Sequence, residues 1–194
     1  MREMPGRASE RSNTGPVIVV SGPPGSGKST YAKRLARELG LQYYTTGQAF
    51  RDLAKRLGVS LVKLNELAER DPKIDLEIDK ETLRRASEGN IVIDSHLAAW
   101  LLHDKADLLV YVKAPLNVRA ERIARRDSIS IKQAYMEILE RENSHRRRFL
   151  KYYGLDIRDL TIFHVIVDTS IYDVDSTYNI IMEAVKERLL KQRY

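Results

Sequence analysis

The chain has 194 residues, of which 43% are hydrophobic and 31% charged, and a formal net charge of +6. This length fits one α/β domain with a sizeable core. No apolar run approaches the ~20 residues that span a bilayer, and the absence of cysteine excludes disulfides and thiolate metal sites. Residues 1–15 are polar and lack the apolar core of a signal peptide. We therefore expect a disordered N-terminal extension and a cytoplasmic location.

The basic excess is concentrated in one part of the chain. Residues 113–151 contain 11 Lys/Arg and 5 Asp/Glu, a difference equal to the whole net charge. Such a stretch can attract nucleic acid or small phosphorylated molecules. No separate nucleic-acid-binding motif accompanies it, so we expect small-molecule phosphates as the partners, with neither nucleic acid nor a membrane.

The first predicted elements form a phosphate-binding unit. Val17–Val20 is a β-branched run that predicts a buried parallel strand, and residues 31–39 have helical spacing of apolar side chains. Between them, residues 22–29 spell G-x-x-x-x-G-K-[ST]. Strand, glycine loop and helix together favour a nucleoside triphosphate site over a turn that only resembles one.

Each part of this loop has an expected role. The backbone N–H groups and the positive end of the following helix would point at an anion. Lys28 would reach the β- and γ-phosphates, and the Ser29 hydroxyl would ligate Mg²⁺. The predicted ATP-binding residues are Gly22, Pro23, Pro24, Gly25, Ser26, Gly27, Lys28, Ser29 and Thr30.

The next segment is predicted to be mostly helical. A short strand at 42–44 is followed by a helix to Arg56 with Thr45 or Thr46 as its cap, by a helix capped by Ser60, and by a helix from Asp71-Pro72 to Gly89-Asn90. The long helical stretch over about residues 46–88 is typical of a mobile substrate-binding subdomain.

The second half continues the alternation of strands and helices. Strands are predicted at 91–94, 108–112 and 163–167, and helices at 115–126, at 131–153 with Gly154 as its stop, and after a cap at Asp175 or Ser176. This order predicts an α/β fold with a five-stranded parallel sheet and helices on both faces, of the P-loop kinase type. We expect a single domain over 16–194, with an Arg-rich lid at about 127–153.

Candidate side chains for the acceptor follow the second and third strands. Arg51 lies one turn inside a helix, where its guanidinium can grip a phosphate while the helix start adds its dipole. The alternative is an ordinary solvated arginine. Asp94 ends a parallel strand, where ligand chemistry in such sheets collects. It would contact the substrate or a water on Mg²⁺, and otherwise it is a turn residue.

Arginines in the basic stretch are the candidates for catalysis. Arg126, just before a loop, is well placed to reach a nucleotide, whereas for Arg119 and Arg122 we favour a solvated basic face. Arg141 and Arg148 are two helical turns apart and could lie at both ends of a phosphoryl group in transfer. The alternative for this pair is an exposed helix whose arginines pair with neighbouring glutamates.

From Val17 to about Ser170 the chain resembles the archaeal-type cytidylate kinases, a group of nucleoside monophosphate kinases. The similar stretches are Gly47–Ala54, Gly58–Leu61, Asp71–Asp79, Ala106-Asp107, Ala114-Pro115, Arg119–Ala124 and Tyr153–Asp156. The acidic Asp-Pro-x-Ile-Asp run is the most discriminating of them, because the phosphate loop is shared with many other enzymes.

The resemblance implies that ATP with Mg²⁺ donates a phosphoryl group to CMP or dCMP. Thr46 and Arg51 would hold the acceptor phosphate, Arg141 and Arg148 would bridge donor and acceptor, and residues 168–170 would lie near the donor base. Asp75 and Asp79 are the candidates for reading the amino group of cytosine. We expect a monomer.

The chain departs from this family after the third strand. Ser95-His96 stands where a Gly-Arg pair is common, so His96 would donate a hydrogen bond in place of a phosphate-binding arginine. Gln48 stands where an acidic residue is frequent. The alternatives are another nucleoside monophosphate kinase, with AMP or UMP as acceptor, and a nucleotide switch or nucleic-acid-stimulated ATPase. The chain contains neither Asn-Lys-x-Asp nor Asp-x-x-Gly, the motifs of a GTPase switch.

Overall fold

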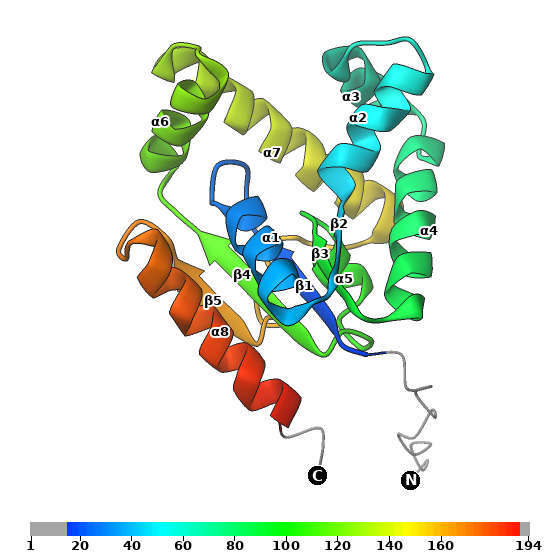
Figure 1. Cartoon of the computed structure of the whole chain (residues 1–194). Helices are drawn as coiled ribbons and strands as arrows, with labels where there is room; N and C mark the ends of the chain where they lie inside the picture. Colours follow the sequence, from blue (N-terminus) through cyan, green and yellow to red (C-terminus); the bar gives the residue numbers. More distant parts are fainter. Residues whose placement is uncertain (1–14, 191–194) are drawn as a thin grey trace, which may run out of the picture.

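The protein, seen here in a computed structural model, is built on one five-stranded parallel sheet in the order β2-β3-β1-β4-β5 (Figure 1). The structure describes residues 15–190; apart from Gly15, the predicted N-terminal extension lies outside these residues. The strands are β1 Val17–Ser21, β2 Gln42–Thr45, β3 Ile91–Asp94, β4 Leu108–Lys113 and β5 Val165–Asp168. The predicted fold class is confirmed.

The described residues also contain eight helices. They are α1 Lys28–Leu39, α2 Thr46–Arg56, α3 Leu61–Arg70, α4 Lys73–Glu88, α5 Ala98–Leu101, α6 Leu116–Asp127, α7 Ile131–Tyr153 and α8 Val174–Leu190. None of the helices that the structure describes is long and apolar enough to cross a membrane.

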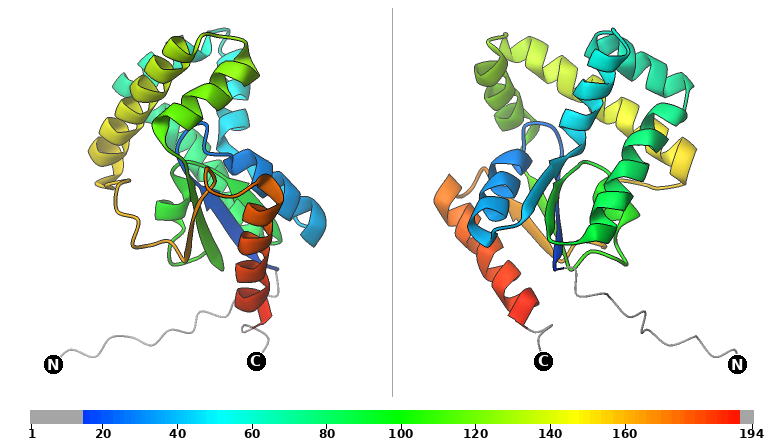
Figure 2. Two further views of the ribbon diagram at one scale, coloured as in Figure 1. Left: turned by 90° about the vertical axis from the view of Figure 1, so that its left-hand side faces the viewer. Right: turned by 45° about the vertical axis from the view of Figure 1, so that its right-hand side comes forward.

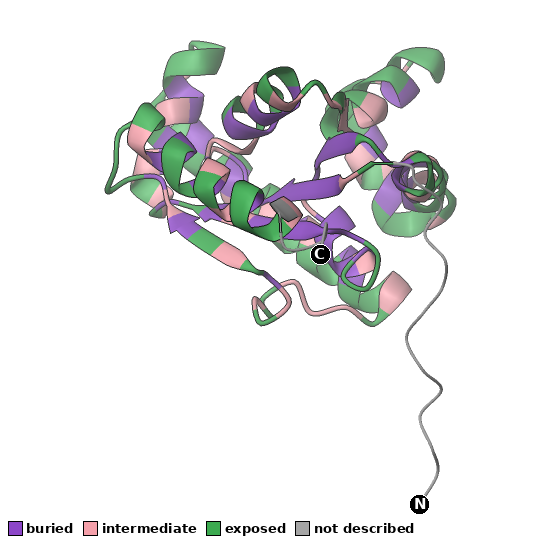
Figure 3. Ribbon diagram, turned by 60° about the horizontal axis from the view of Figure 1, so that its bottom comes forward, coloured by how far each residue is buried: buried purple, intermediate pink, exposed green. Residues whose placement is uncertain are grey.

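The central strand β1 is buried on both faces because helices cover each side of the sheet (Figure 3). On one face, Ile18 and Val20 pack in a core with Leu35 of α1 and Ile181 of α8. On the other face, Val17 and Val19 pack in a second core with side chains of α5 and of the end of α7. This core includes Trp100, Phe149 and Phe163. The uninterrupted apolar run of β1 follows from this two-sided burial.

Helices α2, α3 and α4 form an insertion between β2 and β3 with a small core of its own. Leu53, Leu64 and Ile78, one from each helix, are buried together. The predicted cap of α3 is confirmed, since Ser60 accepts a hydrogen bond from the Lys63 amide at 3.1 Å.

Helix α7 is continuous over 23 residues and reaches from α6 to the insertion (Figures 1 and 2). It begins with a capping box between Ser130 and Gln133 and ends at Gly154, the predicted stop. Ala134 and Ile138 pack against α6 at its beginning. Near its end, the Tyr152 hydroxyl donates to the backbone carbonyls at the end of α3.

Some predicted boundaries were wrong. Strand β5 begins at Val165 rather than at residue 163. The Phe163 amide instead donates to the Leu160 carbonyl in a turn, and the Phe163 ring packs on Trp100 with the two ring centroids 5.1 Å apart. The cap of α8 is provided by Asp173, which accepts from the Ser176 amide at 2.7 Å, rather than by the predicted residues 175 or 176. The short helix α5 was not predicted.

Candidate active site

The loop between β1 and α1 requires glycine at several positions. Gly22, Gly25 and Gly27 have φ angles of +150°, +80° and +92°, where a side chain is strained. A Cβ on Gly22 would also lie 2.1 Å from the carbonyl oxygen of Val112 at the end of β4. The loop therefore curls tightly onto the N-terminus of α1, an arrangement suited to binding an anion.

Lys28, the first residue of α1, folds back over this loop. Its Nζ lies 3.4 Å from the carbonyl oxygen of Pro23. Burial is the main cause that lowers the pKa of Lys28, and Asp94 opposes this effect. Three cations lower the pKa further: Arg141, Arg119 and Arg126. The loop thus faces a cluster of positive charge, and bound phosphates would relieve its mutual repulsion.

Asp94, at the carboxyl end of β3, ties the loop to β2. Its Oδ2 accepts hydrogen bonds from the Ser29 hydroxyl at 2.5 Å and from the Tyr43 hydroxyl at 3.0 Å. Asp94 is buried. The pKa of Tyr43 is raised, first by the burial of Tyr43 itself and then by the negative charge of Asp94. Ser29, a predicted metal ligand, and Asp94 are therefore brought together at one point.

The start of α2 lies next to the end of β3. The Thr46 hydroxyl donates to the Ser95 hydroxyl at 3.1 Å, which places Thr46 beside the end of β3. Arg51 is exposed, and its Nε and Nη2 donate to Gln48 Oε1 at 3.1 and 2.8 Å. The guanidinium is held by a neutral amide, so its charge is available to an anion.

A buried polar cluster joins α4 to α7. Arg148 Nε lies 3.4 Å from Asp75 Oδ2, and both side chains are almost fully buried. Arg148 Nε and Nη1 and Asp75 Oδ2 have no hydrogen-bond partner among the described residues. The Tyr153 hydroxyl donates to Asp79 Oδ2. Burial raises the pKa of Asp75. The pKa of Asp79 is raised to about 6, mainly by burial and further by the charge of Asp75, although the hydrogen bond from Tyr153 lowers it.

The two arginines predicted to act together differ in their surroundings. The charge of Arg141 adds to the burial that lowers the pKa of Lys28 in the phosphate loop, and the charge of Arg51 of α2 is among the lesser causes that lower the pKa of Arg141. Desolvation, followed by the charge of Arg126, lowers the pKa of Arg141. Arg148 lies two turns further along α7, against α4. Arg126 is exposed and pairs with Asp127 at 2.7 Å.

His96 lies under the phosphate loop. Its Nδ1 is 3.0 Å from the carbonyl oxygen of Gly22, and because a carbonyl only accepts, Nδ1–H is the donor. Burial, followed by Lys28, lowers the pKa of His96 to about 3, so the ring is neutral. Its ring centroid lies 4.9 Å from that of His145 of α7, which stacks on Phe149.

The prediction of a solvated face for Arg119 and Arg122 was wrong. Arg119 is buried and donates to the carbonyl oxygens of Ala114 and Pro24. Arg122 donates to Thr169 Oγ1 and to the Thr169 carbonyl oxygen at 2.8 and 2.7 Å. The i, i+3 spacing showed that the two share a helix face but not that this face packs on the loop.

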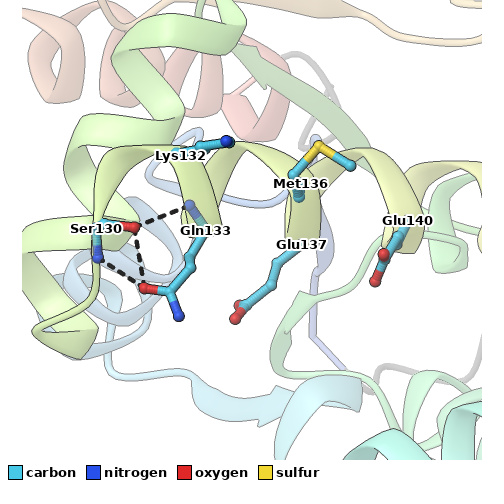
Figure 4. Close-up of a pocket in the computed structure, with 6 residues that line it drawn as sticks. All are labelled: Ser130, Lys132, Gln133, Met136, Glu137 and Glu140. Carbon is cyan, nitrogen blue, oxygen red and sulfur yellow. Dashed lines mark hydrogen bonds between the residues drawn. The ribbon is translucent and has the colours of Figure 1, made fainter.

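A pocket of about 290 Å³ lies along the first half of α7 (Figure 4). It is lined by Ser130, Lys132, Gln133, Met136, Glu137 and Glu140. None of these is a predicted site residue, and its two carboxylates against one lysine disfavour a phosphate.

No group of three or more His, Asp or Glu side chains within residues 15–190 could hold a metal ion alone. Mg²⁺ prefers oxygen ligands and keeps waters and substrate phosphates in its coordination shell. The Ser29 hydroxyl and the Asp94 carboxylate, 2.5 Å apart, are oxygen groups that could hold such an ion together with substrate phosphates.

The sheet order and the glycine loop define the fold of the small P-loop kinases. A shikimate kinase of known structure from Bacteroides thetaiotaomicron has a TM-score of 0.60 to this chain, at 14% identity over 88% of this chain and 98% of its own. The chain belongs to the cytidylate kinase-like family, which matches residues 17–171.

Two relatives carry the same name over nearly their whole length. A cytidylate kinase from Aeropyrum pernix is 60% identical over 170 residues, which is 88% of this chain and 99% of that protein. A cytidylate kinase from Staphylothermus marinus is 47% identical over 176 residues, 91% of this chain and 99% of that protein. The chain is accordingly a phosphotransferase of the nucleoside monophosphate kinase type.

Proposed function

We propose that the protein transfers the γ-phosphoryl group of ATP to CMP or dCMP, giving ADP and CDP or dCDP. The observation that carries this proposal is the phosphate loop with Lys28 folded over it and the Ser29 hydroxyl 2.5 Å from Asp94 at the adjoining strand end. The similarity to cytidylate kinases supports the choice of acceptor. A second candidate acceptor, UMP or AMP, is favoured by no specific contact.

On the donor side, the amides of residues 22–30 and the Lys28 amine would bind the phosphates of ATP. Ser29 would ligate Mg²⁺, which supplies neutralisation of the β- and γ-phosphate oxygens when bound. Asp94 accepts the Ser29 hydrogen bond and thereby orients this hydroxyl.

On the acceptor side, Thr46 and Arg51 would hold the phosphate of CMP. The neutral His96 uses its one N–H on the Gly22 carbonyl, so it would not donate to that phosphate in place of an arginine. An oxygen of that phosphate attacks the γ-phosphorus, the bond to the β-bridging oxygen breaks, and ADP leaves. Arg126, Arg141 and Arg148 would neutralise the charge that spreads over the transferring group, since this reaction depends mostly on positioning and electrostatics.

The base would be read by Asp75 and Asp79. A carboxylate accepts from the amino group of cytosine, whereas the carbonyl of uracil at the same position would face another acceptor. A mismatch of buried polar groups costs about 1–3 kcal/mol, or about ten- to a hundredfold in discrimination. We further propose that the enzyme is a monomer that acts in cytoplasmic pyrimidine nucleotide metabolism.

An acceptor panel tests the proposal. CMP, dCMP, UMP and AMP would each be incubated with ATP and Mg²⁺, and the diphosphates separated by ion-exchange chromatography. We expect the highest kcat/KM with CMP or dCMP. A kcat/KM with AMP or UMP equal to that with CMP would leave only the broader class of nucleoside monophosphate kinases.

A further inference from the structure

The phosphate loop can bind an anion only if its amide groups point inward, which turns its carbonyl groups outward. Buried carbonyls need hydrogen-bond donors. Arg119 Nη1 donates to the carbonyl oxygen of Pro24 at 3.1 Å, and Arg119 Nε donates to that of Ala114 at 2.9 Å. The Thr169 hydroxyl donates to that of Ser26 at 3.0 Å. Arg119 therefore belongs to a frame that holds the back of the loop.

The loop also rests directly on the first turn of α6. A Cβ on Gly25 would lie 2.8 Å from the carbonyl oxygen of Arg119 and 2.9 Å from its Cβ. Because the contact is this close, a shift of α6 at Arg119 would move the loop with it.

The same guanidinium contacts the lid helix. Arg119 Nη1 lies 2.5 Å from Glu142 Oε1, and the Arg119 side chain is only 9% exposed. Glu142 follows Arg141 directly on α7. Charge-assisted hydrogen bonds of this kind are short and about twice as strong as neutral ones. One side chain thus joins the phosphate loop to the helix that carries Arg141.

We propose that Arg119 and Glu142 are positioning residues for phosphoryl transfer, which hold the phosphate loop and Arg141 in fixed relation. Neither residue touches the reacting atoms. The inference rests on the proposed function in that Arg141 is taken to act on the transferring group.

The variants Glu142→Gln and Arg119→Lys test this role, with Glu140→Gln as the matched control. Glu140 is an exposed glutamate on the same helix, two residues from Glu142. Glu142→Gln removes the ion pair and leaves the bonds from Arg119 to the carbonyl oxygens of Pro24 and Ala114. We expect kcat to fall about tenfold, with KM for CMP and ATP within about twofold, because Arg141 is misplaced while both substrates still bind.

Arg119→Lys keeps the charge but loses the planar guanidinium that reaches two carbonyls and a carboxylate. We expect ATP affinity, measured by isothermal titration calorimetry with ATP and Mg²⁺, to fall at least about fivefold, and kcat to fall about tenfold. The double variant should have the same kcat as Arg119→Lys alone, because both changes break one pair.

Thermal unfolding separates positioning from stability. A lower Tm with normal kcat in Glu142→Gln, or a loss of kcat no larger than in Glu140→Gln, would overturn the proposal. ATP titration does not depend on the acceptor. If CMP is not phosphorylated but Arg119→Lys weakens ATP binding and Glu140→Gln does not, the proposed function fails while the role of Arg119 at the loop stands.

Discussion

Replacing Asp79 with asparagine should stabilise the protein at neutral and alkaline pH. Asp79 is 9% exposed, and its pKa is raised from 3.8 to about 6, first by burial. A carboxylate whose pKa is raised on folding favours the folded state when protonated, so its contribution is fully present below pH 3.8 and is lost as the pH rises through about 6. At physiological pH the ionised group destabilises the fold.

The size of the effect follows from the two pKa values. One pKa unit corresponds to about 1.4 kcal/mol, so ionised Asp79 costs about 3 kcal/mol at pH 8 and about 0.5 kcal/mol at pH 4. The asparagine side chain of the variant still accepts a hydrogen bond from Tyr153 but carries no charge. For a chain of this size, a gain of about 2–3 kcal/mol at pH 8 raises Tm by about 5–10 °C.

Urea denaturation of both proteins at pH 4, 6 and 8 measures this directly. We expect the advantage of Asp79→Asn to grow with pH and to disappear near pH 4. Asp156→Asn is the control of opposite sign, because hydrogen bonds from Arg158 lower the pKa of the Asp156 carboxylate to about 2. An advantage independent of pH, or a less stable Asp79→Asn at pH 8, would refute the reasoning.

Three further substitutions address the site itself. Lys28→Ala should lower kcat by about 10²–10³ without lowering Tm, because the amine acts on phosphates and carries no core packing; near-normal turnover in steady-state assays would exclude this role. Arg51→Ala should raise KM for the monophosphate far more than KM for ATP, and an equal rise in both would count against its place on the acceptor side. Gly25→Ala should abolish ATP binding in calorimetric titration, since the new Cβ meets Arg119 and φ is +80°; retained affinity would show that the loop can shift.

Much of the fold could be predicted because its signals are local. The apolar run of β1, the glycine loop, the Ser60 cap and the Gly154 stop each act through residues close in sequence, and each was found at its place. The start of β5 could not be predicted, since Phe163 has the apolar character of a strand residue but is turned into the core by a contact with Trp100, which is distant in the chain.

The residues of the candidate site likewise fall into those that a local motif indicates and those whose surroundings come from distant parts of the chain. The motif located Lys28 and Ser29, and the strand end located Asp94. Sequence could not show that Arg119 is buried, because its surroundings come from the phosphate loop and from α7, both distant in the chain. The partner of Arg148 is likewise on α4, so a spacing rule within one helix could not find it.

Helix α7 has a consequence for how this enzyme can be altered or recombined. At 1.5 Å per residue its 23 residues extend about 35 Å, and its two ends serve different parts of the molecule. A chimera that took residues 127–153 from another nucleotide kinase would import a new Arg141 but would break the bonds from Tyr152 to α3 and the contact of Arg148 with Asp75. Helix α7 and the insertion of α2, α3 and α4 would therefore have to be exchanged together for these contacts to be kept.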